Sequence, residues 1–375
     1  MSKINGPFRA DHVGSYLRTQ PIKDARIKKA AGEISAELLK AIEDVEIADL
    51  VKKQAEAGLI AVTDGEFRRK WWHLDFLLGL NGVKSIKVEK GYKFHSCETP
   101  PENIQVTGRV SYNPDHPFFS HFDYLQSVVP AGCVAKQTIP SPVMLVNTYL
   151  PGPFPPADYT SADEFVEDVA KAYQQTIAEF YRRGCRYLQI DDTKWGAFAE
   201  VLLSDASEAE KAKIVADAER CVKVTNLALS GRPADLLVTM HICKGNFKSD
   251  YCFSAAYDTV VDYIARLEVD AYFLEFDDER SGTFEALATI AKADTAGKKR
   301  VVLGVFSSKV AKLEDEAAIK ARIDDAAKYF PKERLCLSTQ CGFASTEEGN
   351  SLTEVEQYAK LNHVVKVAKD VFGSL

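Results

Sequence analysis

Short runs of apolar, β-branched residues recur along the chain, and stretches of helical periodicity separate most of them. Eight runs are expected to form strands, at 8–15, 59–64, 133–140, 186–192, 236–246, 271–276, 300–306 and 335–342. Helices are expected at about 35–58, 162–183, 207–230, 255–266, 283–293, 314–329 and 353–370. Strands that alternate with helices in this way indicate a parallel sheet.

Eight such units predict a single (β/α)₈ TIM barrel that spans residues 1–375. From about 80 to 130 the rhythm is broken by proline, histidine and aromatic residues, and an inserted hairpin with loops is expected there. A doubly wound open sheet is the alternative fold. It is disfavoured because no glycine-rich phosphate loop follows the first strand.

Charge and cysteine content narrow the range of partners and locations. The net charge of −7, with both signs mixed along the chain, argues against nucleic acid or an anionic membrane as the main partner. No apolar run approaches the roughly 18 residues of a membrane-spanning helix, and the first residues lack the apolar core of a signal peptide. The 8 cysteines are irregularly spaced, which favours a reducing cytoplasm and a role for some of them in metal binding or catalysis.

Polar residues collect at the predicted carboxyl ends of the strands. The set comprises Ser15, Glu66, Asp191, His241, Cys243, Glu275 and Cys341. In a (β/α)₈ barrel this face carries the active site, built from the ends of different strands. Any one of the carboxylates alone could instead cap a helix or lie in a solvated loop.

His241 and Cys243 stand two residues apart on one strand, so their side chains point to the same face and could bind one zinc ion. Glu275 and Cys341 could supply two further ligands from later strands. Four protein ligands ordinarily mark a structural site. An incoming thiol could, however, displace the carboxylate, and zinc would then hold that thiol, whose free pKa is about 8.5, as a thiolate at neutral pH.

Other residues compete with this assignment. Asp277, Asp278 and Glu279 could bind the metal in place of Glu275, but they follow the apolar strand and suit a loop better. Trp71 and Trp72 could form a stacking surface or pack in the core. The remaining cysteines are interpreted as core or surface thiols: Cys97, Cys133, Cys185, Cys221, Cys252 and Cys336.

Several motifs together resemble the catalytic C-terminal half of the cobalamin-independent methionine synthase family. They are His12-Val13-Gly14-Ser15, Asp64-Gly65-Glu66, Ile190-Asp191, His241-Ile242-Cys243, Glu275 and Cys341-Gly342. The resemblance implies a zinc ion held by His241, Cys243, Glu275 and Cys341. It also implies that Glu66 and Asp191 bind the ammonium group of a thiol amino acid, while Ser15 and its neighbours bind the carboxylate.

The sequence departs from the long members of that family on the side of the methyl donor. Lys309 stands where they have a histidine thought to protonate the leaving group, and Tyr149 is an approximate substitute for a tryptophan that supports the pterin ring. The additional N-terminal barrel that helps them hold folate has no counterpart here. Short, stand-alone members are more similar, so folate cannot be assumed as the donor, and another protein could supply the missing surface.

The expected activity is zinc-dependent methyl transfer to a thiol, with homocysteine as acceptor and methionine as product. This resembles the reaction of a 5-methyltetrahydropteroyltriglutamate–homocysteine S-methyltransferase. One alternative keeps the zinc-bound thiolate and changes the electrophile to an epoxide or an alkyl-sulfur compound. A metal-free uroporphyrinogen decarboxylase-like enzyme is possible from the fold alone, and a structural-zinc or thiol-sensing protein is the non-enzymatic alternative.

Overall fold

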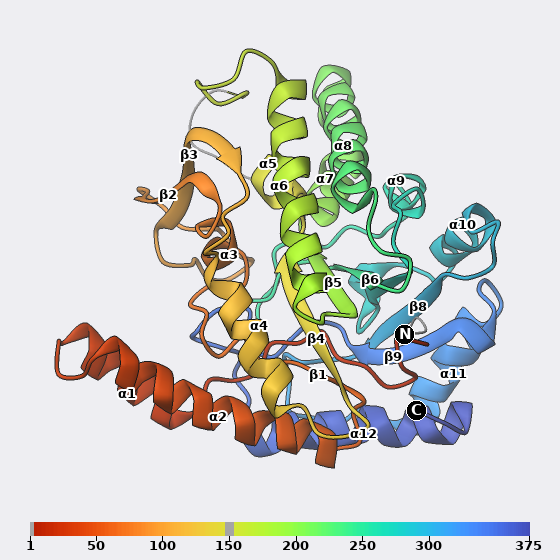
Figure 1. Cartoon of the computed structure of the whole chain (residues 1–375). Coiled ribbons are helices and arrows are strands. Elements are labelled where there is room, and N and C mark those ends of the chain that lie inside the picture. The colour runs from red at the N-terminus through yellow and green to blue at the C-terminus, as the bar shows by residue number, and fades with distance from the viewer. Residues whose placement is uncertain (1–3, 147–153) are drawn as a thin grey trace.

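A parallel sheet of seven strands forms the centre of the molecule, in the order β1-β4-β5-β6-β7-β8-β9 (Figure 1). The structure is a computed structural model and describes residues 4–146 and 154–375. The strands are β1 (Ala61–Val62), β4 (Val134–Pro140), β5 (Tyr187–Asp192), β6 (Leu237–Ile242), β7 (Ala271–Glu275), β8 (Arg300–Phe306) and β9 (Leu335–Thr339). The sheet curls with helices on its outer side, so the predicted TIM-barrel-like fold is confirmed.

The first predicted strand, 8–15, closes the barrel without forming a regular ladder. Ala10 makes a single parallel bridge with Leu337 of β9. On the other side, the Thr63 hydroxyl donates to the Gly14 carbonyl at 2.6 Å, and further contacts from this segment reach β1. Side chains thus replace much of the backbone pairing there, and the segment fills the eighth position between β9 and β1.

Most predicted helices are present, although their ends shift. They are α2 (Ala36–Glu56), α6 (Ala162–Arg182), α8 (Glu208–Leu229), α10 (Ala286–Ala293), α11 (Glu316–Ala326) and α12 (Glu354–Phe372). The helix expected at 255–266 is reduced to α9 (Val261–Ala265). Shorter elements complete the fold: α3 (Leu74–Leu77), α5 (Val143–Val146), α7 (Lys194–Leu203), and the 3₁₀ turns η1 (Glu279–Ser281) and η2 (Lys332–Arg334). No helix in the described parts of the chain combines the length and apolar character needed to cross a membrane.

Besides the short helices α3, α5 and α7, two helices of more than ten residues lie where the sequence pattern predicts none. α1 (Gln20–Ala30) precedes α2, and α4 (Pro117–Val128) occupies part of the 80–130 region that was assigned to loops. Pro117 stands in the first turn of α4, where its fixed φ and missing N–H suit a helix. Phe118, Phe119, Phe122 and Leu125 then bury one face of it. The predicted hairpin of this region is confirmed as the antiparallel pair β2 (Asn81–Lys87) and β3 (Glu102–Ser111).

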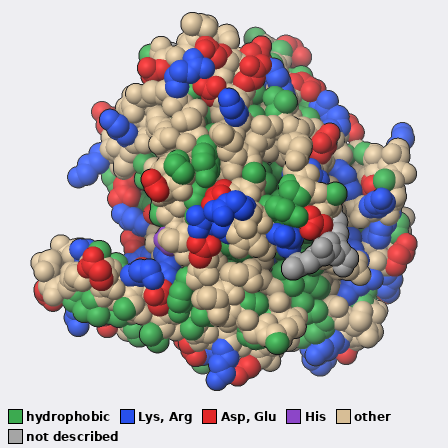
Figure 2. Space-filling model, in the orientation of Figure 1, with side chains coloured by type: hydrophobic (Ala, Val, Ile, Leu, Met, Phe, Trp, Pro, Cys, Tyr) green, Lys and Arg blue, Asp and Glu red, His purple; other side chains and the backbone are tan. Residues whose placement is uncertain are grey.

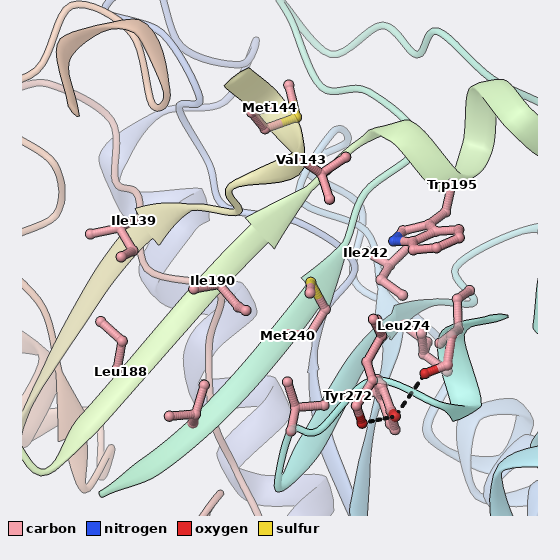
Figure 3. Close-up of a cluster of buried hydrophobic side chains, with 14 of the residues drawn as sticks. Ile139, Val143, Met144, Leu188, Ile190, Trp195, Met240, Ile242, Tyr272 and Leu274 are labelled. Carbon is pink, nitrogen blue, oxygen red and sulfur yellow. Dashed lines mark hydrogen bonds between the residues drawn. The ribbon is translucent and has the colours of Figure 1, made fainter. Parts of the chain in front are cut away.

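Side chains alternate along the central strands, and this alternation positions the functional residues. Figure 3 shows one set, which includes Ile190, Met240 and Leu274, packed outward against the helical layer and Trp195 of α7. The intervening positions point to the other face of the sheet. These positions include Asp191, His241 and Glu275, which therefore share the inner face of the barrel near its carboxyl end.

Candidate metal and substrate site

Four potential metal ligands converge at the carboxyl end of the barrel. One ligand atom from each of His241, Cys243, Glu275 and Cys341 lies within 4.8 Å of the others, and all four residues are buried. The two sulfur atoms are 3.7 Å apart. The structure therefore brings together the predicted ligand set from the ends of β6 and β7 and the turn after β9, and Asp277 is not part of it.

The register of the parallel strands orients the histidine of this group. Asp191 of β5 is the direct partner of His241 on β6, and Asp191 Oδ1 lies 3.0 Å from His241 Nδ1. Burial opposes charge on the imidazole, but Asp191 and the neighbouring Cys341 raise the pKa of His241 to about 9. A metal ion would therefore displace a proton on binding. The sequence had implied only a substrate-binding role for Asp191, and its contact with His241 is an additional finding.

The sulfur atoms of the two cysteines form a hydrogen bond with each other. The hydrogen bond between the sulfur atoms raises the pKa of Cys243 and lowers the pKa of Cys341, with burial also raising the former. The Gly245 backbone N–H donates to Cys243 Sγ at 3.2 Å, and the lowered pKa makes Cys341 the thiolate of the pair. The pair is thus prepared to supply at least one thiolate.

The remaining ligand, Glu275, has one oxygen without a partner. Its Oε1 accepts a hydrogen bond from the Lys244 backbone N–H at 3.1 Å, whereas its buried Oε2 has no hydrogen-bond partner. Burying an unsatisfied carboxylate oxygen costs free energy. An orphaned oxygen beside two sulfurs and an imidazole fits zinc, which accepts nitrogen, sulfur and carboxylate ligands in a tetrahedral arrangement.

A cavity of about 540 Å³ adjoins this group. His241, Cys243 and Cys341 line it, whereas Glu275 and Lys309 are not part of its lining. The predicted substrate-binding residues Ser15, Glu66 and Asp191 line it as well. Of the residues predicted for the site, Tyr149 lies outside the part of the chain that the structure describes.

Ser15 and Gly342 both line this cavity and are in close contact with each other. The Ser15 hydroxyl accepts a hydrogen bond from the Ala344 backbone N–H at 3.4 Å. A Cβ atom on residue 342 would lie only 1.9 Å from Ser15 Oγ. Glycine next to Cys341 is therefore required for the first strand and the turn after β9 to meet at this point.

The backbone of Glu66 has an unusual conformation. Its φ of 60° lies in the left-handed region, which costs a non-glycine residue free energy. Oε1 pairs with Arg69 at 3.1 Å and accepts a hydrogen bond from Thr138 at 2.9 Å, while the buried Oε2 has no partner. Burial, aided by Asp191, raises the pKa of Glu66 to about 7 even though Arg69 opposes the shift. A free carboxylate oxygen is thus available to a cationic group.

Lys309 lies near the ligand set but outside the cavity lining. Its Nζ is buried without a hydrogen-bond partner, as is Oδ1 of Asp277. Burial lowers the pKa of Lys309, but the carboxylates of Glu275 and Asp277 and the sulfur of Cys243 outweigh it, so the pKa is raised. Lys309 therefore retains its proton firmly and is a poor proton donor.

The outer wall of the cavity is aromatic. Trp71 and Trp72 line it, and Trp71 also packs in the main hydrophobic core, so the packing role is confirmed and the stacking role stays a prediction. Five further aromatic residues of this wall carry no individual signal in the sequence: His73, Tyr92, Phe94, Phe247 and Phe253. Cys252, interpreted from the sequence as a core or surface thiol, also lines the cavity. The only sequence signal for the part of this wall that comes from the insertion is its enrichment in aromatic residues, which predicts a hairpin with loops rather than a cavity wall.

Comparison with known proteins gives a consistent result. Residues 8–370 match the model of the family described as the catalytic domain of the cobalamin-independent synthase. The Bacillus subtilis protein YxjH is 45% identical over 371 residues, which cover 98% of this chain and 95% of YxjH. The 5-methyltetrahydropteroyltriglutamate–homocysteine methyltransferase of Thermotoga maritima is 22% identical over 371 residues, and this match covers 98% of the chain but only 45% of that enzyme.

Two solved structures are similar over nearly the whole chain. One is the putative vitamin-B12 independent methionine synthase from Listeria monocytogenes, with a TM-score of 0.77 and 39% identity, covering 98% of this chain and 99% of that one. The other is a B12-independent methionine synthase from Shewanella sp. W3-18-1 in complex with selenomethionine, with a TM-score of 0.70, 18% identity and 98% coverage of both chains. At that identity the second likeness supports the fold.

Proposed function

The chain belongs to the cobalamin-independent methionine synthase family, and on that premise we propose that it is a zinc-dependent S-methyltransferase whose acceptor is homocysteine. Methyl transfer of the methionine synthase type is the chemistry of the family. The observation that carries the proposal for this chain is the group of four ligand residues, three of which line a cavity shared with Ser15, Glu66 and Asp191.

His241, Cys243, Glu275 and Cys341 would hold the zinc ion. Bound there, zinc would bind the acceptor sulfur and lower the pKa of its thiol from about 8.5, so that a thiolate is present at neutral pH. The open cavity beside the ligands supports this catalytic role over a purely structural zinc site, and the ligand set itself argues against a metal-free decarboxylase.

The protein would orient the acceptor through its amino acid end. Glu66 and Asp191 present carboxylate oxygens to the ammonium group, and Ser15 with its neighbouring backbone would bind the carboxylate. Holding both the ammonium and the carboxylate group fixes the direction of the acceptor sulfur. It also removes much of the entropic cost of bringing the acceptor and the methyl donor together. The sulfur lone pair then forms the new bond to the methyl carbon, and the donor leaves with the electron pair of the broken bond.

Lys309 would act as a positioning residue for Glu275. The acceptor enters from the cavity, whose lining includes the other three ligands but not Glu275. A carboxylate that gives way to the incoming sulfur would remain buried, where an unpaired negative charge is costly. The unpartnered ammonium of Lys309 provides a nearby countercharge for it.

Zinc-dependent alkylation of a thiol by an epoxide or an alkyl-sulfur compound would use the same ligands. The deciding experiment is mass spectrometry of homocysteine incubated with zinc-loaded protein and a panel of methyl and alkyl donors. We expect methionine to form with at least one methyl donor, and Cys341→Ser protein to form none. Alkylation by an epoxide without methylation by any donor would favour the alternative, and no alkylation at all would contradict both.

Asp191→Asn is expected to weaken zinc binding by roughly 10–100-fold, because it removes the carboxylate that orients His241. Competition with a chromophoric chelator measures the change. Asp192→Asn is the matched control, because the adjacent Asp192 carboxylate accepts a hydrogen bond from Ser141 rather than contacting His241. Equal zinc affinity of the Asp191→Asn and unmodified proteins would show that the Asp191–His241 contact does not support the metal.

Binding of L-methionine, a product that has no thiol to titrate, is expected to strengthen as pH rises. The pKa of Glu66 is about 7, so its carboxylate becomes charged only as the pH passes through that value. Titration calorimetry between about pH 6 and about pH 7.5 should show an increase in affinity of several-fold, up to about tenfold. Glu66→Gln keeps the shape of the side chain but removes its charge, so it should abolish the pH dependence of methionine binding. A pH dependence that survives Glu66→Gln would assign it to another group.

A further inference from the structure

A helical arm extends from the barrel and has no role in the site described above. It consists of α1, the turn after it and the first half of α2, which together span residues 20–46 (Figure 1). Arg26 anchors its base through an ion pair with Glu347 at 3.0 Å. Beyond that anchor, most of the residues from 27 to 41 are exposed, so the part of the chain that the structure describes leaves the tip uncovered.

The arm exposes an apolar stripe with the spacing of a helix-packing surface. Leu38, Ile42 and Val45 follow one another at intervals of four and three residues, which places them on one face of α2. Leu38 is 48% exposed and Val45 is 66% exposed, and on α1 Ile27 is 69% exposed. Figure 2 shows the arm standing clear of the body of the molecule. Another helix could therefore pack against this stripe.

Charge is segregated between the two helices of the arm. α1 carries four basic residues and one acidic residue: Lys23, Arg26, Lys28, Lys29 and Asp24. Residues 36–46 of α2 carry four acidic residues and one basic residue: Glu37, Glu43, Asp44, Glu46 and Lys40. Some of these charges are paired within the chain, as in Lys40–Asp44. Within residues 4–146 and 154–375, however, Lys23, Lys28, Lys29, Glu37 and Glu46 form no ion pair.

We propose that two copies of this chain associate through their arms about a two-fold axis, with α1 of each copy against α2 of the other. A two-fold contact requires a surface that is complementary to itself. Here the basic helix of one copy would meet the acidic helix of its partner twice, and Ile27 would cover the stripe that contains Leu38 and Val45. Residues 20–46 hold five basic and six acidic side chains, which fits a second copy better than a nucleic acid or an anionic membrane.

Light scattering during size-exclusion chromatography tests the association on the full, zinc-loaded chain. We expect a mass of twice 41.5 kDa at micromolar concentration. Leu38→Glu/Val45→Glu should weaken the dimer at least tenfold and leave a folded monomer with an unchanged circular dichroism spectrum, because both side chains are exposed on the single chain. Leu203→Glu is the matched control, since Leu203 at the end of α7 is 57% exposed but far from the arm in sequence. A monomeric unmodified protein, or a dimer unaffected by the double substitution, would overturn the proposal.

A charge exchange tests the pairing of α1 with α2 directly. Lys28→Glu/Lys29→Glu and Glu37→Lys/Glu46→Lys should each give monomers, because each change places like charges opposite one another at both contacts. An equimolar mixture of the two variants should form a heterodimer, since both contacts then join opposite charges. A mixture that stays monomeric while the unmodified protein is dimeric would show that the dimer uses another arrangement.

Discussion

Cys243→Ser/Cys341→Ser protein is expected to retain almost no zinc, whereas the unmodified protein should bind about one zinc ion per chain. The substitution removes both soft sulfur ligands and leaves one imidazole and one carboxylate, a pair too weak to hold the ion. Elemental analysis after dialysis against a mild chelator measures the change. The loss should also appear as a lower melting temperature, because a ligand present at 100 times its Kd stabilises a fold by about 2.7 kcal/mol.

Cys336→Ser is the matched control for this experiment. Cys336 is also fully buried on β9, but its side chain belongs to the interior cluster with Val13, Phe273 and Val302 rather than to the ligand group. The control should keep its zinc even if its stability falls. Full zinc occupancy in the Cys243→Ser/Cys341→Ser protein would remove the metal site on which the proposed function rests.

Monoglutamate methyltetrahydrofolate is expected to support little or no methionine formation, whereas a more activated donor such as methylcobalamin or a methyl sulfonium should work better. A tertiary amine leaves readily only when it is protonated. The family resemblance predicts that Lys309 takes the place of a histidine of the long members, and its raised pKa makes it a poor acid at neutral pH. The two donors are compared side by side with homocysteine and zinc-loaded protein. Efficient turnover with the folate alone, unaffected by Lys309→Ala, would contradict this assignment.

The ends of the strands could be predicted from the sequence because each apolar run stops at a polar residue. His241, Cys243 and Glu275 follow or close such runs, and parallel strands in a barrel place their carboxyl ends together. The contact between Asp191 and His241 could not be predicted in the same way. It depends on the register between β5 and β6, which places the two residues directly opposite each other. The sequence pattern of a single strand does not determine that register.

The outer half of the cavity escaped prediction for a different reason. Its wall comes partly from the segment between β2 and β3, whose residues have neither helical nor strand periodicity. Tyr92 and Phe94 reach the cavity only because this segment folds back over the barrel end, a long-range packing event that local sequence does not encode. α4 was missed because its proline and aromatic residues are also common in loops, although a proline in the first turn suits a helix.

The proposed function requires that a metal ion in this site binds and activates the thiol of an amino acid. Titration calorimetry with homocysteine and homoserine, on zinc-loaded and zinc-free protein, tests it most directly because the two ligands differ only in sulfur against oxygen. Zinc-loaded protein should bind homocysteine at least about 100-fold more tightly than homoserine and release about one proton per homocysteine bound, since a coordinated thiol is deprotonated. Zinc-free protein should show neither effect. Equal affinity for the two ligands on zinc-loaded protein would contradict the account.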